Sequence, residues 1–347
     1  MCIDKEEVDK IKIIPLLKTL RLQKIDDAEY FSKKYNGYIS NSRLSLINPE
    51  QENDPDAFFE GLNKHLKFSD ALLLGNALHA KVLQPLCFHL PNIASRPTAK
   101  LGFVADELYK IYKNKEVTND DILEASNKIG YYKDKMSEAR IEHVKESCKH
   151  YWKERKEYEE TNKLDSIPIF LDTKMRERTF LCVDAIHANK DIMNLLCPKG
   201  IIKDPECGNE QTILLDVEMR VPDYDPFIFK LKAKVDNYSL DFETNNVIVN
   251  DVKTIGKILS AFEDNFNKFH YSRELAIYNW LMSLVAIYKY NMKDFKISSN
   301  CLVVSTIPQY YTRVYKVTKN QLSEGWDEFK FLLKLAAYYY SKGYRFE

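Results

Sequence analysis

The chain has 347 residues, which is long enough for one large core or for two domains. Its 51 basic and 51 acidic residues cancel, which argues against a protein that coats nucleic acid through an overall positive field. An enzyme whose positive charge lines a single channel is not excluded. Aromatic residues make up 12% of the chain, which argues against disorder.

Seven cysteines are scattered along the chain without a C-x-x-C pair, and their number is odd. This usage predicts a reduced, cytoplasmic protein rather than a disulfide framework. The N-terminus has no apolar core of a signal peptide, and no window approaches the roughly 18 apolar residues of a membrane helix. We therefore expect neither a signal peptide nor a membrane contact.

The first part of the chain predicts short helices. Residues 1–36 are charged and are expected to form a helical lead-in with no identifiable chemistry. Ser40 or Ser42 is expected to cap a helix that Pro49 closes, and Asp54 begins another with apolar residues at helical spacing.

A longer helix comes next, capped by Ser69 and Asp70 and ended by Pro85. It carries Gly75 and, one turn later, His79. On periodicity alone, His79 fits a satisfied core histidine better than a ligand. Residues 105–164 then show a helical and very polar pattern, typical of a solvated helical face, with an oligomer contact as the alternative.

After an amphipathic helix over 172–196, period-two apolar patterns predict a sheet. Asp236 comes directly after the second strand, and the turn residues of 241–246 favour a hairpin that brings Asp236 beside the third strand. The three expected strands span 212–220, 227–235 and 247–254.

The third strand ends in the triplet Asp251-Val252-Lys253. Residues two apart on a strand point to the same face, so Asp251 and Lys253 stand side by side, about 6–7 Å apart. Two carboxylates, Asp236 and Asp251, can hold a hard divalent cation, and an ammonium beside them can orient or deprotonate a water. A solvated surface hairpin is the plainer alternative, but a charged pair that ends an otherwise apolar strand is typical of a functional site.

The remaining elements predict an α/β fold with a mixed sheet. A long helix over 267–290 carries Tyr271, Glu274 and Tyr278 on one stripe. Strands are expected near 301–307 and 311–317, and a C-terminal helix is expected to begin at Ser323.

These motifs together resemble the PD-(D/E)XK nuclease superfamily. The helix from Gly75 through His79 to Pro85 and the helix from Tyr271 to Tyr278 narrow the resemblance to the RecE-type exonucleases (exonuclease VIII), a phage and prophage recombination family. The opening segment 37–44 is similar as well. Each motif alone is weak, but their order and spacing are specific, and the resemblance runs from about residue 37 to the C-terminus.

The resemblance implies a restriction-endonuclease-like fold, in which helices flank and elaborate a mixed central sheet. It implies one nuclease domain over 37–347, with a helical insertion around 105–196. It also implies a cofactor, Mg²⁺, for which Mn²⁺ substitutes. The residues that match the family's metal ligands are His79, Asp236, Asp251 and the backbone carbonyl of Val252.

In the family pattern Lys253 positions the attacking water and stabilises developing charge. Many superfamily members carry another acidic residue near the metal on the preceding strand. Glu218 is the candidate here, and an edge-strand surface glutamate is an equally good interpretation of it. Arg96 and Lys100, in a loop after the His79 helix, and Tyr271 are candidates for contacts with DNA.

The function implied is a metal-dependent deoxyribonuclease that acts as a 5′→3′ exonuclease on linear double-stranded DNA in recombination or DNA processing. The partners implied are duplex DNA, a single-strand annealing protein and further copies of this chain in a ring, in the cytoplasm of a bacterial or phage-infected cell. An endonuclease of the same superfamily is one alternative. A non-catalytic DNA-binding or interaction module that keeps the fold is the other.

The chain departs from the family pattern at Glu274, which stands where the family has glutamine, while Tyr278 is retained. A carboxylate accepts hydrogen bonds but cannot donate as an amide does. We therefore expect Glu274 to contact metal-bound water, Lys253 or another local cation. Arg273 points roughly 100° away on the helix and is a poor partner. Val235 replaces the proline of the superfamily name.

Overall fold

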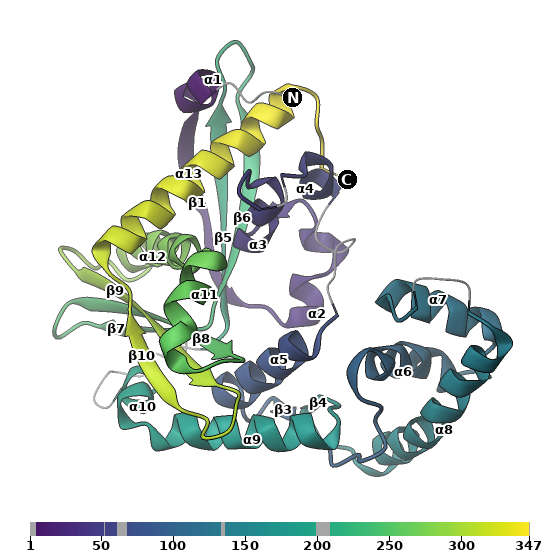
Figure 1. The fold of residues 1–347 in the computed structure, drawn as a ribbon. Helices are drawn as coiled ribbons and strands as arrows, with labels where there is room; N and C mark the ends of the chain where they lie inside the picture. The colour runs from purple at the N-terminus through teal and green to yellow at the C-terminus, as the bar shows by residue number, and fades with distance from the viewer. Residues whose placement is uncertain (1–4, 52, 61–67, 133–135, 199–208, 347) are drawn as a thin grey trace. The chain divides into compact units, whose positions relative to one another are not determined.

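A computed structural model describes residues 5–51, 53–60, 68–132, 136–198 and 209–346 (Figure 1). The chain divides into two compact units. Unit 1 comprises Met1–Leu66, Asn189–Ser305 and Tyr311–Glu347, and unit 2 comprises Lys67–Ala188 and Thr306–Tyr310. The positions of the units relative to one another are not determined, so each is described by itself.

Unit 1 is built on two four-stranded sheets, ordered β1-β5-β6-β2 and β10-β9-β8-β7. Both are mixed, because β2 runs parallel to β6 and β8 runs parallel to β9 while the other neighbours are antiparallel. Their strands are β1 (Lys12–Lys24), β2 (Tyr38–Ile39), β5 (Gln211–Arg220), β6 (Phe227–Val235), β7 (Asn237–Asp241), β8 (Asn246–Ile255), β9 (Lys296–Ser305) and β10 (Thr312–Lys316).

The three strands predicted around the Asp-x-Lys triplet are confirmed as β5, β6 and β8, and the predicted hairpin is the antiparallel pair β7–β8. The helical lead-in predicted over 1–36 is wrong for much of its length. Residues Lys12–Lys24 form β1, an edge strand that pairs with β5. Pro15 explains the difference, because proline disrupts a helix interior but is tolerated on an edge strand.

Helices cover the sheets of unit 1, and the two longest pack on one another (Figure 1). Helix α12 also contacts β8 and β9. A Cβ at Gly325 of α13 would lie 2.3 Å from the backbone of Ser272 in α12, so only glycine permits this crossing. The helices are α1 (Lys5–Lys10), α2 (Asp27–Tyr30), α3 (Asn41–Leu44), α4 (Pro55–Glu60), α10 (Lys190–Leu196), α11 (Phe262–Lys268), α12 (Tyr271–Tyr288) and α13 (Lys319–Ser341).

The local capping chemistry explains where several helices begin. Ser40 accepts a hydrogen bond from the Arg43 backbone at the start of α3, as predicted. The C-terminal helix begins earlier than the predicted Ser323. Thr318 and Gln321 form a capping box there, and this box satisfies the first amides of α13.

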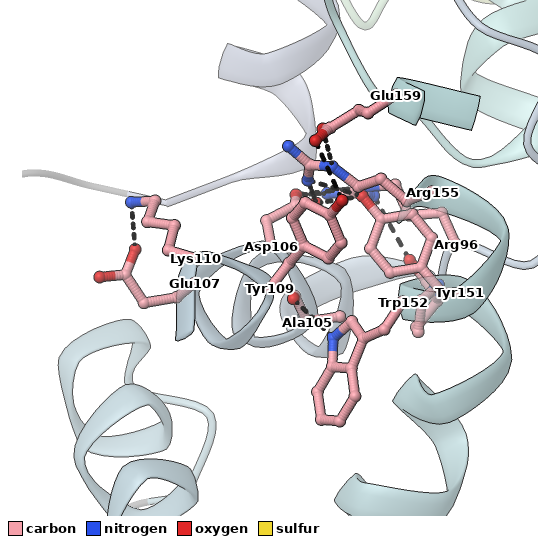
Figure 2. Close-up of polar contacts among 11 residues, drawn as sticks. Arg96, Ala105, Asp106, Glu107, Tyr109, Lys110, Tyr151, Trp152, Arg155 and Glu159 are labelled. Atoms are coloured by element: carbon pink, nitrogen blue, oxygen red, sulfur yellow. Dashed lines mark hydrogen bonds and ion pairs between the residues drawn. The ribbon is translucent and has the colours of Figure 1, made fainter. Parts of the chain in front are cut away.

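Unit 2 is helical, with one short parallel pair of strands. Its core packs around Trp152, whose indole N–H donates to the Ala105 carbonyl (Figure 2). Its elements are α5 (Asp70–Leu83), β3 (Phe88–His89), α6 (Ala99–Tyr112), α7 (Asn119–Ile129), α8 (Glu138–Thr161), β4 (Ile167–Pro168) and α9 (Thr173–Ala188). Among the described residues of both units, no helix combines the length and the apolar character needed to cross a membrane.

Candidate active site

Strand register brings Asp236 beside the Asp-x-Lys strand. Asp236 lies between β6 and β7, and the β7–β8 hairpin pairs the next residue, Asn237, with Asn250. The Asp236 carboxylate Oδ2 accepts a hydrogen bond from the Val252 backbone N–H at 2.8 Å. The carboxylate is thereby held against the strand that carries Asp251 and Lys253.

A ladder of buried asparagines fixes this register from within the sheet. Asn250 donates to the Asn237 side chain at 2.8 Å, and Asn300 of β9 donates to Asn250 at 2.9 Å. Asn250 also donates to the Leu195 carbonyl near the end of α10. A one-residue slip would leave these buried amides unpaired and would turn Asp251 to the opposite face.

Lys253 lies at the centre of the cluster that results. Its Nζ is 2.8 Å from Asp251 Oδ2 and 2.9 Å from Glu274 Oε2. The Tyr278 hydroxyl donates to the other oxygen of Glu274 at 3.1 Å, and Nζ lies 4.6 Å from the centre of the Tyr271 ring. The predicted contact between Glu274 and a local cation is confirmed, and that cation is Lys253.

The Arg273 side chain turns away from the cluster, as the helical geometry predicted, although its charge helps to lower the pKa of Glu274. Its guanidinium is buried and donates to Asn41, Ser45 and Glu328, which ties α12 to α3 and α13. The two adjacent residues therefore serve different ends. Arg273 holds the helix in place, and Glu274 faces the cluster.

The electrostatics of the cluster arise from burial and from an excess of carboxylates. Asp251 is 1% exposed, and burial raises its pKa well above the usual range; Lys253 opposes that shift, while Glu274 and Asp236 add to it. Burial also raises the pKa of Glu274, but the Lys253 ammonium and the Tyr278 hydroxyl outweigh it and lower that pKa below its usual value.

The pKa of Lys253 is raised well above its usual value, because Asp251, Glu274 and Asp236 outweigh the opposing effect of burial. Lys253 is therefore a charged ammonium at neutral pH. Of the two roles that the sequence left open for it, this charge favours orienting a water and stabilising charge over removing a proton.

The donor atoms of the cluster fit a hard divalent cation. Asp251 Oδ2 is buried and touches the Lys253 ammonium, but this contact lacks hydrogen-bond geometry, so the oxygen accepts no hydrogen bond from the described residues. Carboxylate oxygens of Asp236 and Glu210 lie within 4.8 Å of one another. Oxygen donors and excess negative charge are what Mg²⁺ and Mn²⁺ require.

Glu210 is a site residue that the sequence reasoning missed. The antiparallel pairing of Gln211 with Val235 leads directly to Glu210 and Asp236, and the Glu210 N–H donates to the Asp236 carbonyl at 2.8 Å. The signal lay in the sequence, because an acidic residue one position before a strand meets the residue just after the neighbouring antiparallel strand. Its carboxylate also pairs with Lys234 at 3.0 Å.

Glu218, proposed as a second-metal ligand, is wrongly placed by the sequence. It lies seven positions further along β5 than Gln211, which is roughly 24 Å at the rise of a strand, and it pairs with Ile228. Its carboxylate bonds Arg220 on the same strand. The prediction put an acid on the correct strand but at the end remote from Asp236.

The two predicted basic DNA contacts lie in unit 2. Arg96 is wrong as a phosphate ligand, because its side chain is fully buried and forms an ion pair with Asp106 at 2.8 Å (Figure 2). Lys100 is exposed, and its Nζ donates to the Gly130 carbonyl at 2.7 Å, where it caps the end of α7. A DNA contact by Lys100 stays a prediction.

His79 lies on α5 of unit 2, whose position relative to unit 1 is not determined. Its role as a metal ligand therefore stays a prediction, as does that of the Val252 carbonyl. Within unit 1, the structure brings together Asp236, Asp251, Lys253, Glu274, Tyr271 and Tyr278.

Cys301 is, after Glu210, a second residue beside the cluster that the sequence did not predict to lie there. It pairs with Asp251 in the parallel β8–β9 register, and its thiol is fully buried. Burial, and then the Asp251 carboxylate, raise its pKa well above the usual value, so the sulfur stays a neutral thiol. A neutral thiol is a poor metal ligand. The oxygen donors of the site therefore determine which metals it prefers.

Comparisons with known proteins add little to this geometry. No protein-family model matches the chain, and no curated protein matches it. Among solved structures, it is similar to a crystal structure named "Putative exonuclease" from Eubacterium rectale. The two are 12% identical, the match covers 91% of this chain and 87% of that chain, and the TM-score is 0.38. A likeness at that score carries no argument about function, so any proposal rests on the residues of the site itself.

Proposed function

We propose that unit 1 is a metal-dependent deoxyribonuclease, and specifically a Mg²⁺-dependent 5′→3′ exonuclease on linear duplex DNA. One observation supports it above the others. A buried carboxylate, Asp251, lies against a charged lysine two residues before the end of β8, beside further carboxylates, and its Oδ2 contacts that ammonium at 2.8 Å without hydrogen-bond geometry and accepts no hydrogen bond from the described residues. Such a set is costly in a folded protein unless a cation completes it.

Each residue of the cluster would have a distinct role. Asp236 and Asp251 would hold the cation, with Glu210 within reach of Asp236. When bound, Mg²⁺ would act as a Lewis acid on the scissile phosphate and lower the pKa of its bound water. The Lys253 ammonium, fixed by two carboxylates, would orient the attacking water and offset the negative charge that develops on the phosphate.

Glu274 and Tyr278 would keep Lys253 in place. Glu274 accepts hydrogen bonds from both Lys253 and the Tyr278 hydroxyl. These two contacts restrict the Lys253 side chain to few rotamers. A glutamine here could keep one acceptor for Lys253 but would supply no charge. The departure from the family pattern is therefore compatible with catalysis.

The direction of digestion, the linear substrate and the partners come from the family resemblance alone. A 5′→3′ exonuclease would leave a 3′ single strand for an annealing protein, and a ring of several copies would confine the duplex. A digest of end-labelled linear duplex and of a covalently closed circle of the same sequence, with Mg²⁺ or with EDTA, tests the direction, the linear substrate and the need for metal together. Loss of the 5′ label from linear DNA only, in Mg²⁺ only, is the expected result.

The other outcomes separate the alternatives. Cleavage of the closed circle would identify an endonuclease, and an intact linear substrate in Mg²⁺ and in Mn²⁺ would identify a non-catalytic module. Loss of the 3′ label first would reverse the polarity and keep the chemistry.

A further inference from the structure

An exposed aromatic side chain lies close to the candidate active site and has no part in the cluster. Phe269 comes directly after the last residue of α11, and 47% of its surface is exposed. Single exposed apolar side chains are common on protein surfaces. Phe269 differs from most of them because the backbone that carries it is fixed by its surroundings.

The backbone at the corner between α11 and α12 is held in an uncommon conformation. His270 has φ 53° and ψ 43°, in the left-handed region that residues other than glycine seldom adopt. Its ring Nδ1 lies 2.8 Å from Glu328 of α13, which also binds the buried Arg273 at 2.7 Å. Such strain persists only where the surroundings enforce it, and it gathers at functional sites. The corner therefore presents Phe269 in a fixed position.

A short chain of rings leads from Phe269 to the reacting end of the cluster. The Phe269 and Tyr271 ring centres are 5.8 Å apart, and the Tyr271 ring centre is 4.6 Å from Lys253 Nζ. Because these two distances add, the Phe269 ring lies at most about 10 Å from that ammonium. Lys268 adds a cation, with Nζ 5.5 Å from the centre of the Phe269 ring.

We propose that Phe269 is a stacking platform for an unpaired nucleobase of the strand whose phosphate reaches Lys253. This rests on the proposed function of the site. Because the ring lies at most about 10 Å from the ammonium, a base on the ring and a phosphate at Lys253 are no more than about three nucleotides apart at roughly 3.4 Å per nucleotide, and Lys268 can meet a neighbouring phosphate. A base inside a duplex has both of its faces stacked on neighbouring bases. Phe269 can therefore stack only on a base of a frayed end or of a single strand. Every base has such a face, so the platform is tolerant of sequence.

The test uses the full chain with Ca²⁺, which occupies magnesium sites and activates water poorly. The probe is a linear duplex with one unpaired 2-aminopurine at its 5′ end, whose fluorescence falls when it stacks. Wild type should quench it. Phe269→Ala should lose the quenching and bind roughly 5- to 100-fold more weakly, as expected for one lost stacking partner. Phe269→Tyr should restore both.

Phe242→Ala is the matched control. Phe242 is 45% exposed and lies in the β7–β8 turn, at the opposite end of β8 from Lys253. Equal quenching by wild type and Phe269→Ala overturns the platform, as does an equal loss in Phe242→Ala. Cleavage in Mg²⁺ by a wild type that does not quench overturns the platform and keeps the nuclease. Quenching that depends on Phe269 without any cleavage upholds the platform and rejects the nuclease.

Discussion

Each unit of the molecule contains a cluster of charged side chains and tyrosines, and the two clusters differ in charge balance. In unit 2, Asp106 accepts from Arg96, Arg155 and Tyr151, and the Arg155 guanidinium also bonds Glu159 (Figure 2). Cations and acids are matched, and the described contacts join α8 to α6 and to the loop before it. Such a network is a scaffold.

The cluster of unit 1 has the opposite character. Asp236, Asp251 and Glu274 surround a single ammonium, that of Lys253, and one oxygen of Asp251 accepts no hydrogen bond from the described residues. Buried charge is thus not in itself a sign of function, because the buried guanidinium of Arg96 in unit 2 is matched by the carboxylate of Asp106. The deficit of positive charge, with oxygen donors around it, is what marks a site for a cation.

The largest effect is expected from the lysine and the buried aspartate of unit 1. Lys253→Ala and Asp251→Asn should each lower Mg²⁺-dependent cleavage by about 10³-fold or more, about 4 kcal/mol of lost transition-state stabilisation. The thermal midpoint of Asp251→Asn should stay unchanged or rise, because one of three crowded carboxylates is removed, whereas that of Lys253→Ala should fall, because those acids lose the ammonium between them. Glu218→Gln, on β5 of the other sheet of unit 1 and remote from Asp236, is the control. A cleavage rate near wild type from either variant would contradict the assignment.

The scaffold of unit 2 should respond in stability instead. Asp106→Ala leaves Arg96 buried without a counter-charge and should cost about 3 kcal/mol in the free energy of unfolding. Urea denaturation followed by circular dichroism would measure it. A variant as stable as wild type would mean that the network of Figure 2 is not a scaffold.

Another buried cation, Lys232, sharpens the comparison, because no described carboxylate pairs with it. Lys232 donates to the Tyr30 carbonyl, and burial, helped by Arg43, lowers its pKa to about 8. The folded state thus disfavours the charged form. The loss of folding stability that this burial causes is complete below pH 8, where Lys232 is charged in both states. It disappears as the pH rises toward the unfolded pKa of about 10.4.

The free energy of unfolding should therefore rise by about 2 kcal/mol between pH 8 and 10.4 relative to Lys232→Met, in which no amine titrates. Urea midpoints of the two proteins across that range provide the measurement. Parallel curves would show that Lys232 has an ordinary pKa.

The smallest effect is expected at Glu274. Glu274→Gln should keep cleavage within a few-fold of wild type and shift the Mg²⁺ concentration needed for half-maximal rate, because one negative charge beside Lys253 is lost. Glu274→Lys, which puts two ammoniums together, should be far more damaging. If both variants match wild type in rate and in metal requirement, the Glu274–Lys253 contact has no part in catalysis.

The sequence predicted those parts of the site that depend on local pattern. Period-two alternation located β6 and β8, turn residues joined β7 to β8, and helical spacing placed Glu274 and Tyr278 on one face. Register between strands is a tertiary property, and there the prediction failed. Glu218 and Glu210 are eight positions apart on or beside one strand, and only the pairing of Gln211 with Val235 decides which of them meets Asp236.

Burial was the other property that the pattern could not supply. Arg96 stands in a polar stretch that is typical of a surface cation, yet Asp106, ten residues later on α6, draws it inside. Pro15 was the missed local signal, because a proline in a run with Ile13 and Ile14 argues for an edge strand. The asparagine ladder, in turn, emerges only when three strands are aligned.

Calorimetric titration with Mn²⁺ tests the central claim most directly, since it asks whether the carboxylates of unit 1 form a metal site without requiring a DNA substrate. Wild type and Glu218→Gln should bind Mn²⁺ alike, and Asp251→Asn should lose at least about tenfold in affinity, because a buried ligand oxygen and its charge are removed. Equal Mn²⁺ affinity for wild type and Asp251→Asn, or no binding by wild type, would contradict the account.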